Sequence, residues 1–493
     1  MRDFVRAYLS GEAAAFFPAH PLDPDARRRA VLRARRPIAP ALHDALVRQN
    51  QAYAASPARD RHLAELARGA AAVVTGQQVG LFLGPLYTLY KAASAVVVAR
   101  RLAEESGTPV VPIFWLQTED HDLVEIASCG LPGLTISLPA SAENRVSVAH
   151  LRLPPEIEER LGELADFLGD GVHAKAHVAR LRRHYRPGVP WAAAFAGLLA
   201  ELFAPEGLVL IDPRDPALAP LAAPVHERAL RDAEPIADAL AARAQALAAA
   251  GFEAPVHVRP DAALSFVHDG GPEGSRRRAL PGDAGQDPRL YSTSALLRPI
   301  LEATLLPSAA YVGGPAEVAY FAQLGPLYEH YGLAMPLVVP RARFTVIDAR
   351  ARRLLERLGL EPADLARTEA ELLARLCPPA ERATALVDAF QQAHAALSAR
   401  LGGGDPAIAR ALLRTHRSVS RALERLDARL TRAAAYRDGE TVAALRRLIA
   451  LLAPPQERRL GLPALVAPQG DRELVEKVLA AIDPFEPSLK EIA

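Results

Sequence analysis

Cysteine is scarce in this chain, and long apolar runs are missing. Only Cys129 and Cys377 occur among 493 residues, which excludes a disulfide framework and a cysteine-rich zinc site and fits a reducing cytoplasm. No run approaches the roughly 18 apolar residues of a membrane span, and the N-terminal stretch lacks the apolar region of a signal peptide. The sequence therefore predicts a cytoplasmic protein that does not associate with a membrane.

The net charge of the chain is also small. The 58 basic residues balance 57 acidic ones, so the chain has no general electrostatic attraction to nucleic acid or to an anionic membrane. Only four of the basic residues are lysines: Lys91, Lys175, Lys477 and Lys490. A lysine kept in such a chain can mark a place where a guanidinium would not serve, although chance explains each one equally well.

Strands and helices alternate over most of residues 70–345. Residues 70–74, 86–102 and 109–116 have the pattern of a βαβ unit, which implies a parallel sheet with a right-handed crossover. Strands are also predicted at 208–211, 311–312 and 337–339, helices at 217–230, 233–250 and from 315 to about 331, and a β-hairpin insertion near 255–280. The predicted fold class is therefore α/β, with a Rossmann-like parallel-sheet core over residues 1–345.

Residues 346–453 are predicted to form a protruding, antiparallel α-helical coiled-coil arm. Apolar residues recur at alternating spacings of three and four in 381–402 and again in 406–436. Between them, Gly402–Pro406 combines a helix stop, an N-cap and an N1 proline, which indicates a tight turn. The apolar seam should pair two chains into a homodimer, and residues 454–493 should return to pack on the core.

The first candidate site is the glycine-spaced segment 75–85. Its glycines let the backbone approach a ligand closely, and the helix N-terminus that follows favours an anion. The spacing matches neither a Walker loop nor a dinucleotide-binding fingerprint, and glycines needed only for tight turns explain it equally well. The candidate substrate- or nucleotide-binding residues here are Gly76, Gln77, Gln78, Gly84 and Tyr87.

Lys91 lies with Thr88 and Ser94 on the only polar stripe of the helix that follows. A lysine on a mostly buried helix must snorkel to water, pair, or line a cavity. Because the glycine-spaced segment is close, we expect Lys91 to be a catalytic residue that contacts a negatively charged group of substrate or nucleotide. A snorkelling lysine is the alternative.

The second candidate site is the run Glu119, Asp120, His121 and Asp122, directly after the predicted strand 109–116. In parallel sheets the ligand crevice lies beyond the carboxyl ends of the strands, so all four are candidate catalytic residues. The three carboxylates could bind Mg²⁺, and Asp120 or His121 could accept a proton from an attacking amine. Alternatively, Asp122 is only a helix N-cap, with Glu125 completing a capping box.

The third candidate site combines Arg298 with Gly313, Gly314 and Glu317, where a second glycine pair ends a strand and opens a helix. Arg298 could clamp a carboxylate or phosphate, although a surface salt bridge fits equally well. Cys129 lies close to the acidic run, but no Cys/His or Ser/His/Asp arrangement is visible. A nucleophilic cysteine is therefore not favoured.

Three long segments resemble the bacillithiol biosynthesis cysteine-adding enzyme family, BshC: TGQQVGLFLGPLYTLYKA, PVVPIFWLQTEDHDLVEI and LLRPILEATLLPSAAYVGGPAEVAYFAQL. The resemblance covers most of the chain and implies a Rossmann-like core and a coiled coil that mediates dimerisation. It also implies a ligase that adds L-cysteine to the amine of glucosaminyl-malate, the last step of bacillithiol synthesis. Leu116-Gln117-Thr118 stand where small residues commonly precede the acidic run, which leaves the exact substrate open.

This activity fits the chemistry of the candidate residues. Amide formation needs an activated carboxylate and a neutral amine, and ATP could activate the cysteine carboxylate while the glycine-spaced segment and Lys91 hold its phosphates. Asp120 or His121 could then deprotonate the amine. Two other classes stay open: a different adenylate-forming or nucleotidyl-transfer enzyme, and a non-catalytic dimeric nucleotide-binding protein.

Overall fold

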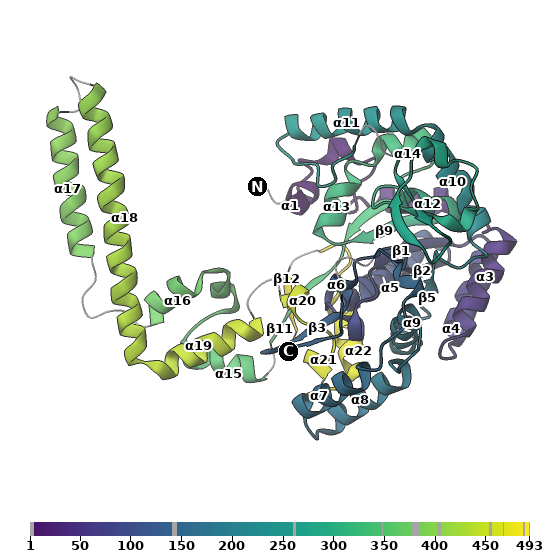
Figure 1. Cartoon of the computed structure of the whole chain (residues 1–493), viewed down its shortest axis with the longest axis horizontal. Helices are drawn as coiled ribbons and strands as arrows, with labels where there is room; N and C mark the ends of the chain where they lie inside the picture. Colours follow the sequence, from purple (N-terminus) through teal and green to yellow (C-terminus); the bar gives the residue numbers. More distant parts are fainter. Residues whose placement is uncertain are drawn as a thin grey trace. The chain divides into compact units, whose positions relative to one another are not determined.

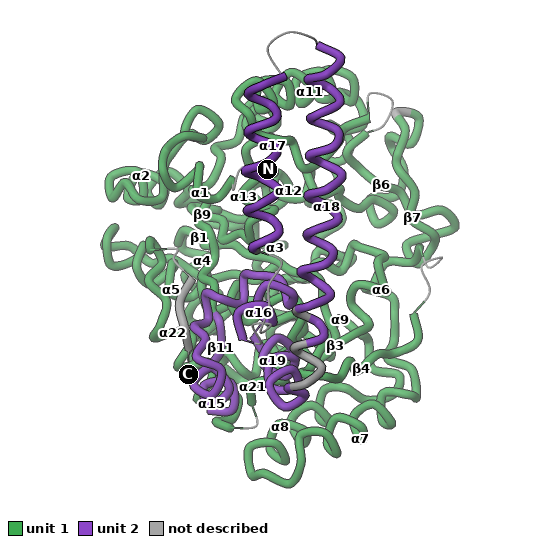
Figure 2. The backbone as a smooth tube through the Cα atoms, turned by 90° about the vertical axis from the view of Figure 1, so that its left-hand side faces the viewer, with its two compact units in different colours: residues 1–344, 457–492 green, residues 345–456, 493 purple. Residues whose placement is uncertain are grey.

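The computed structural model describes residues 4–140, 145–259, 263–347, 349–376, 384–401, 406–452, 456–466, 468–486 and 489–492. The chain divides into two compact units, Met1–Phe344 with Glu457–Ile492, and Thr345–Gln456 with Ala493 (Figure 2). No helix in the described ranges is long and apolar enough to cross a bilayer.

A five-stranded parallel sheet forms the centre of the first unit (Figure 1). In spatial order its strands are β10 (Leu337–Pro340), β9 (Ser308–Gly313), β1 (Ala71–Gln77), β2 (Val110–Leu116) and β5 (Val209–Ile211). All neighbouring pairs are parallel. Numbered along the chain, the strands lie in the order 5-4-1-2-3, which is the Rossmann order read from the other edge. The predicted Rossmann-like parallel sheet is confirmed.

Side chains alternate between two cores, one on each face of the sheet, because successive strand residues point to opposite faces. Ala71 and Val73 belong to the core formed with α2 (Pro24–Ala34) and α5 (Tyr87–Ser106). Ala72 and Val74 belong to the other core. Its helices are α1 (Phe4–Leu9), α3 (Pro40–Gln51), α4 (Pro57–Ala67), α10 (Ala219–Arg231), α11 (Ala233–Ala249), α12 (Arg298–Leu305), α13 (Pro315–Phe321) and α14 (Gly325–Tyr331).

Helix α5 connects β1 to β2 and confirms the predicted βαβ unit. It runs four residues beyond the predicted end and stops where Gly107 adopts a left-handed conformation with φ 65°. The helix predicted from 315 to about 331 is instead two helices, α13 and α14. Pro326 at the start of α14 has no N–H to continue an α-helical ladder, which accounts for the break.

The predicted hairpin insertion is present as β6 (Ser265–Asp269) and β7 (Ser275–Arg278), and β8 (Tyr291–Thr293) adds a third antiparallel strand. Residues 256–258, at the start of the predicted hairpin insertion, form no strand. The side chain of Gln323 bonds the N–H and C=O of Val256, at 3.1 and 2.9 Å, in place of a strand partner.

The first unit has further elements around this core. They are α6 (Leu123–Ile126), β3 (Ser128–Leu131), β4 (Leu134–Ser137), α7 (Ile157–Leu168), α8 (Val172–His184), α9 (Trp191–Leu202), α20 (Gln456–Arg459), α21 (Pro463–Val466), α22 (Asp471–Ala481) and β12 (Leu489–Ile492). Strand β11 (Arg343–Val346) leads from the first unit into the second.

The second unit is helical. Leucines of α15 (Ala349–Leu358), α16 (Glu369–Leu376) and α19 (Gly439–Leu452) form its core. The long helices α17 (Thr384–Leu401) and α18 (Pro406–Arg437) lie side by side (Figures 1 and 2). The turn predicted at 402–405 lies outside the described residues, and the coiled coil stays a prediction.

Strand β5 is an edge of the sheet, and two amide side chains of α3 take the place of a neighbouring strand. The Asn50 amide donates to Leu210 O at 2.8 Å and accepts from Leu210 N at 3.0 Å. Gln49 pairs in the same way with the backbone of Asp212, at 3.2 and 2.8 Å. These bonds satisfy backbone groups on the open side of β5 and fix the chain where it leaves the sheet.

We expect Asn50→Ala to destabilise the first unit. Asn50 is 4% exposed, so its loss leaves a buried N–H and a buried C=O without partners. At about 1–3 kcal/mol for each group, the free energy of unfolding should fall by about 2–6 kcal/mol, measured from the urea midpoint. Gln49→Ala is the matched control, because water can reach its half-buried position, and it should cost less than half as much. Equal losses would contradict the role of Asn50 at the edge strand.

Candidate functional site

A cavity of about 840 Å³ lies beyond the carboxyl ends of β1 and β9. The strand order reverses between these two strands, and open α/β sheets bind ligands at such a point. Residues from the first and third predicted sites meet in its lining: Gln77, Gln78, Gly84, Tyr87, Lys91, Arg298, Gly314 and Glu317.

Gly76 and Gly313 are absent from the lining and have packing roles instead. A Cβ on Gly76 would lie 3.0 Å from Trp115 O on β2, and one on Gly313 would lie 3.0 Å from Glu317 Cβ. Both distances are shorter than ordinary contacts, so a side chain would push neighbouring elements apart. At these two positions the structure shows close packing within β1 and β9, which is neither the ligand contact nor the tight turn that the sequence pattern suggests.

Lys91 is buried, with 2% exposure, so it does not snorkel to water. Its Nζ donates to Gly76 O at 2.7 Å and to Gln77 Oε1 at 3.0 Å, and it forms an ion pair with Glu317. Three acceptors match the three N–H groups of an ammonium. Lys91 therefore ties α5 to the end of β1 and to α13.

Glu317 is held as a carboxylate by this ion pair. It also accepts from Tyr311 Oη at 2.6 Å and from Gly314 N at 2.7 Å. Burial alone would raise its pKa, but Lys91 and these donors outweigh burial and hold the pKa of Glu317 below its usual range. The two charges of this pair neutralise each other at the wall of the cavity.

Arg298 lines the cavity, within range of the charges of Glu302 and Glu317. Among the described residues its guanidinium makes no hydrogen bond or salt bridge, and its buried Nε has no acceptor. The predicted alternative of a surface salt bridge is thus not what the structure shows. An unpaired guanidinium at a cavity wall is suited to a carboxylate or phosphate.

Sequence reasoning missed much of the rest of the lining, which includes Gln117, Glu125, Tyr320, Arg341 and Arg459. Arg341 is buried and donates to Glu457 Oε1 at 2.9 Å. Arg458 and Arg459 come from α20, almost 400 residues beyond β1 in the chain. The C-terminal segment was predicted to pack on the core, but no local sequence pattern indicates which part of the core it contacts.

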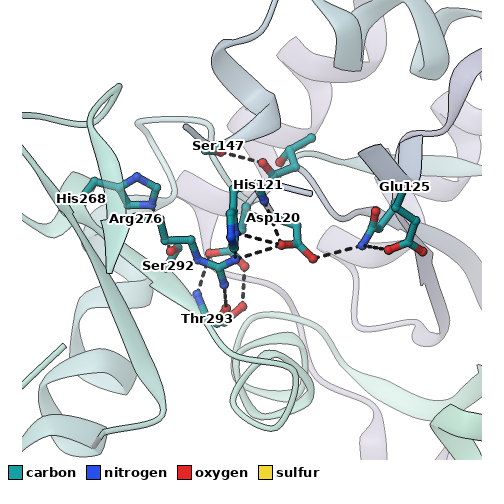
Figure 3. Close-up of polar contacts among 11 residues, drawn as sticks. Asp120, His121, Glu125, Ser147, His268, Arg276, Ser292 and Thr293 are labelled. Carbon is teal, nitrogen blue, oxygen red and sulfur yellow. Dashed lines mark hydrogen bonds and ion pairs between the residues drawn. The ribbon is translucent and has the colours of Figure 1, made fainter. Parts of the chain in front are cut away.

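The acidic run is occupied by donors from the protein itself (Figure 3). Glu119 accepts from Thr293 N at 3.0 Å and from Thr293 Oγ1. Asp120 forms an ion pair with Arg276 at 3.0 Å. Asp122 accepts from the backbone N of Glu125 at 3.1 Å and is the N-cap of α6, as the alternative interpretation expects.

These three carboxylates do not converge on one point, and within the described ranges no three His, Cys, Asp or Glu side chains gather as metal ligands. The arrangement in the described ranges therefore gives no support to binding of Mg²⁺ by Glu119, Asp120 and Asp122, which the sequence left possible. The physical reason is that each carboxylate already has a partner in the protein. Glu119 accepts from Thr293 of β8, Asp120 pairs with the Arg276 guanidinium, and Asp122 caps the N-terminus of α6.

Arg276 of β7 fastens the hairpin insertion to the end of β2. Its Nη1 donates to Asp120 Oδ1 at 3.0 Å and to His121 Nδ1 at 3.2 Å, and its Nη2 donates to Thr293 O at 2.8 Å (Figure 3). The guanidinium lies 3.8 Å from the centre of the Phe266 ring. Burial would raise the pKa of Asp120, but Arg276, the backbone N–H of His121 and the charge of Arg298 together outweigh burial and lower this pKa.

Gln78 connects the acidic run to the cavity. Its Nε2 donates to Asp120 Oδ2 at 3.1 Å and to Glu125 Oε2 at 2.9 Å (Figure 3). Gln78 and Glu125 line the cavity, whereas Glu119, Asp120, His121 and Asp122 do not. The first and second predicted sites are thus neighbours, but the cavity reaches the second through Gln78 and Glu125.

A second, smaller cavity of about 400 Å³ lies beyond β5, and Glu119 is the only predicted site residue in its lining. Arg214 lines it too, but its Nη atoms donate to the carbonyl oxygens of Tyr291 at 2.8 Å and Pro272 at 3.0 Å. These contacts join the segments around Arg214, Pro272 and Tyr291, so the Arg214 guanidinium has few N–H groups left to bind a ligand.

Cys129 lines the larger cavity and is buried. Burial raises the pKa of its thiol to about 12, so it stays protonated at neutral pH, and a thiolate nucleophile is not favoured. Cys377 lies outside the described residues.

The fold and the position of the cavity define a Rossmann-like α/β protein with a cavity at the point where the strand order reverses. The sequence pattern described as "Bacillithiol biosynthesis BshC, N-terminal Rossmann-like domain" matches residues 2–283 and 273–342. The chain belongs to the BshC family.

Curated relatives agree with this assignment, and each is named "Putative cysteine ligase BshC". The protein of Koribacter versatilis is 40% identical over 67% of this chain and 66% of its own length. That of Solibacter usitatus is 35% identical over 84% of this chain and 82% of its own, and that of Salinibacter ruber is 34% identical over 71% and 69%.

We expect Lys91→Met to be strongly destabilising. Removing one partner of a buried ion pair leaves the other charge uncompensated, and the free energy of unfolding should fall by about 3–5 kcal/mol. Lys91→Met combined with Glu317→Gln should recover part of that loss in the same urea titration. Lys477→Met, on an exposed lysine of α22, is the control and should change stability by less than about 0.5 kcal/mol. If the double variant is no more stable than Lys91→Met, the ion pair is not the cause.

Proposed function

We propose that this chain is a ligase that adds L-cysteine to the amine of glucosaminyl-malate, the last step of bacillithiol synthesis. Family membership supports the class of reaction. The observation that carries the proposal is the cavity itself, because segments far apart in the sequence line one site where such folds bind ligands. The active site would be this cavity.

The charge of the cavity suits acidic substrates. Its lining contains Lys91 and four arginines but only two carboxylates, Glu125 and Glu317, and Glu317 is paired with Lys91. Glucosaminyl-malate has two carboxylates in its malate part. Arg298, whose Nε has no hydrogen-bond partner among the described residues, would bind one of these carboxylates bidentately.

Joining a carboxylate to an amine requires that the carboxylate be activated, and we propose ATP as the activating nucleotide. When bound, ATP would supply a phosphorylated or adenylylated cysteine carboxylate. Exposed Arg458 and Arg459 at the cavity are suited to its phosphates. We assign no magnesium ion to Glu119, Asp120 or Asp122, because their partners in the protein occupy them.

The test is an incubation of the purified protein with cysteine, glucosaminyl-malate, ATP and Mg²⁺, followed by mass spectrometry of thiols. We expect the condensed product, and none when cysteine, acceptor or ATP is omitted. Nucleotide cleavage without that product would indicate a different adenylate-forming or nucleotidyl-transfer enzyme. Calorimetry that shows nucleotide binding without turnover would indicate a non-catalytic binding protein.

We also propose that the chain forms a homodimer through an α17–α18 coiled coil. Large apolar side chains are exposed along these two helices: Leu386, Leu397, Leu401, Ile408, Leu413 and Leu426. A groove of about 820 Å³ with mostly apolar lining lies beside them and includes Val387, Phe390 and Leu423. Exposed apolar surfaces of this kind usually bind another protein, and a second copy gives closed symmetry.

Leu397→Glu with Leu423→Glu should convert the dimer to a monomer, because the new carboxylates would be buried in the interface. Light scattering at micromolar concentration measures the change in mass. Circular dichroism is the control and should show unchanged helicity, since neither leucine is fully buried in the monomer. A wild-type chain with the mass of a monomer would refute the proposal.

A further inference from the structure

We propose that Glu125 is the general base that accepts the proton of the attacking amine. The assignment rests on the proposed ligase function and identifies the proton acceptor within the same cavity. Sequence reasoning considered Glu125 only as part of a capping box. In the structure Asp122 caps α6 through the Glu125 backbone N, while the Glu125 carboxylate is free of the cap and contacts Gln78.

The residues that the sequence predicted as the general base are already bound to other groups of the protein. A general base must be able to take up a proton near neutral pH. Asp120 is paired with Arg276, and its pKa is lowered, so it is a weak base. Glu119 is bound by Thr293 through both oxygens, and neither side chain lines the cavity.

His121 is unsuited for a different reason. Its Nδ1 lies 3.2 Å from Arg276 Nη1 and 3.3 Å from Asp120 Oδ1, so this nitrogen is engaged within the acidic run. The His121 side chain does not line the cavity where the amine would bind.

Glu125 has the properties that the others lack. Of the two carboxylates in the cavity, Glu317 is paired with Lys91, whereas no salt bridge joins Glu125 to a cation among the described residues. Gln78 Nε2 donates to Glu125 Oε2 at 2.9 Å and holds it at the rim. Partial burial, then the charges of Asp122 and Asp120, raise the pKa of Glu125 above its usual range, toward the pH at which a carboxylate base is most effective.

The step balances without a further reactant beyond the nucleotide already proposed. The acceptor enters as an ammonium, and the Glu125 carboxylate takes one proton from it. The amine nitrogen then attacks the carbonyl carbon of activated cysteine, a C–N bond forms, and the C–O bond to phosphate breaks with its electron pair on the leaving oxygen. The second proton on nitrogen passes to solvent. Glu125, part of whose side chain reaches solvent at the cavity rim, also returns its own proton there.

The test compares Glu125→Gln with the wild-type chain over a pH series, with formation of the cysteinyl product as the readout. Activity of the wild type should rise with pH through the pKa of Glu125, because only the carboxylate form is active. Glu125→Gln should lower kcat by about 10²–10⁴, leave KM for the acceptor within a few-fold, and remove this rise. Glu158→Gln, on an exposed residue of α7 outside the cavity, should behave as wild type.

A neutral nucleophile provides a readout that a purely structural role would not change. Hydroxylamine is largely uncharged at neutral pH, so it does not need a base before attack. With hydroxylamine in place of glucosaminyl-malate, the ratio of the wild-type kcat to the Glu125→Gln kcat should be at least tenfold smaller. A wild-type chain that forms no cysteinyl product overturns the ligase function together with this proposal. If the wild-type chain forms the product but Glu125→Gln has a kcat within threefold of wild type and the same pH dependence, only the role of Glu125 is overturned.

Discussion

The buried contact between Lys91 and Glu317 is the constraint on which the rest of the site depends. It joins the helix after β1 to the helix after β9, and those two strands flank the point where the strand order reverses. The ammonium also bonds the backbone of Gly76, so the end of β1 is fixed in the same contact. A charge pair placed here neutralises itself, so the positive character of the cavity comes from the arginines of its lining, Arg298 and the exposed Arg458 among them.

The site is built in two layers with different chemistry. The cavity wall has cationic side chains suited to binding an anionic ligand. The carboxylates of the acidic run beside it are already bonded to Arg276, to Thr293 and to the N-terminus of α6. Gln78 is the link between the layers, since its amide bonds a carboxylate in each. This arrangement explains why a run of ionisable residues at the end of a strand does not have to be the reactive group. Position after a strand predicts proximity to the ligand, and the donors from other segments determine which side chains stay available.

Sequence reasoning succeeded where local pattern determines structure. The apolar runs of β1 and β2 and the mostly apolar helical run between them identified the βαβ unit, and the isolated lysine of α5 identified a buried polar position. It failed where the partner comes from a distant segment. Nothing near Asp120 reveals that Arg276, 156 positions later, neutralises it. Nothing near Val256 reveals that Gln323 replaces a strand. Glu125 was read as part of a helix cap because the capping pattern is local and the cavity is not.

Arg458 and Arg459 of α20 have a consequence for the synthesis of the protein on the ribosome. The sheet is complete once β10 has emerged, but the wall of the cavity still lacks these two arginines and Glu457, the partner of Arg341. More than a hundred residues of the helical unit must be translated before they appear. A nascent or prematurely terminated chain can therefore contain every strand of the Rossmann-like sheet and still present an open, incomplete pocket to its substrates.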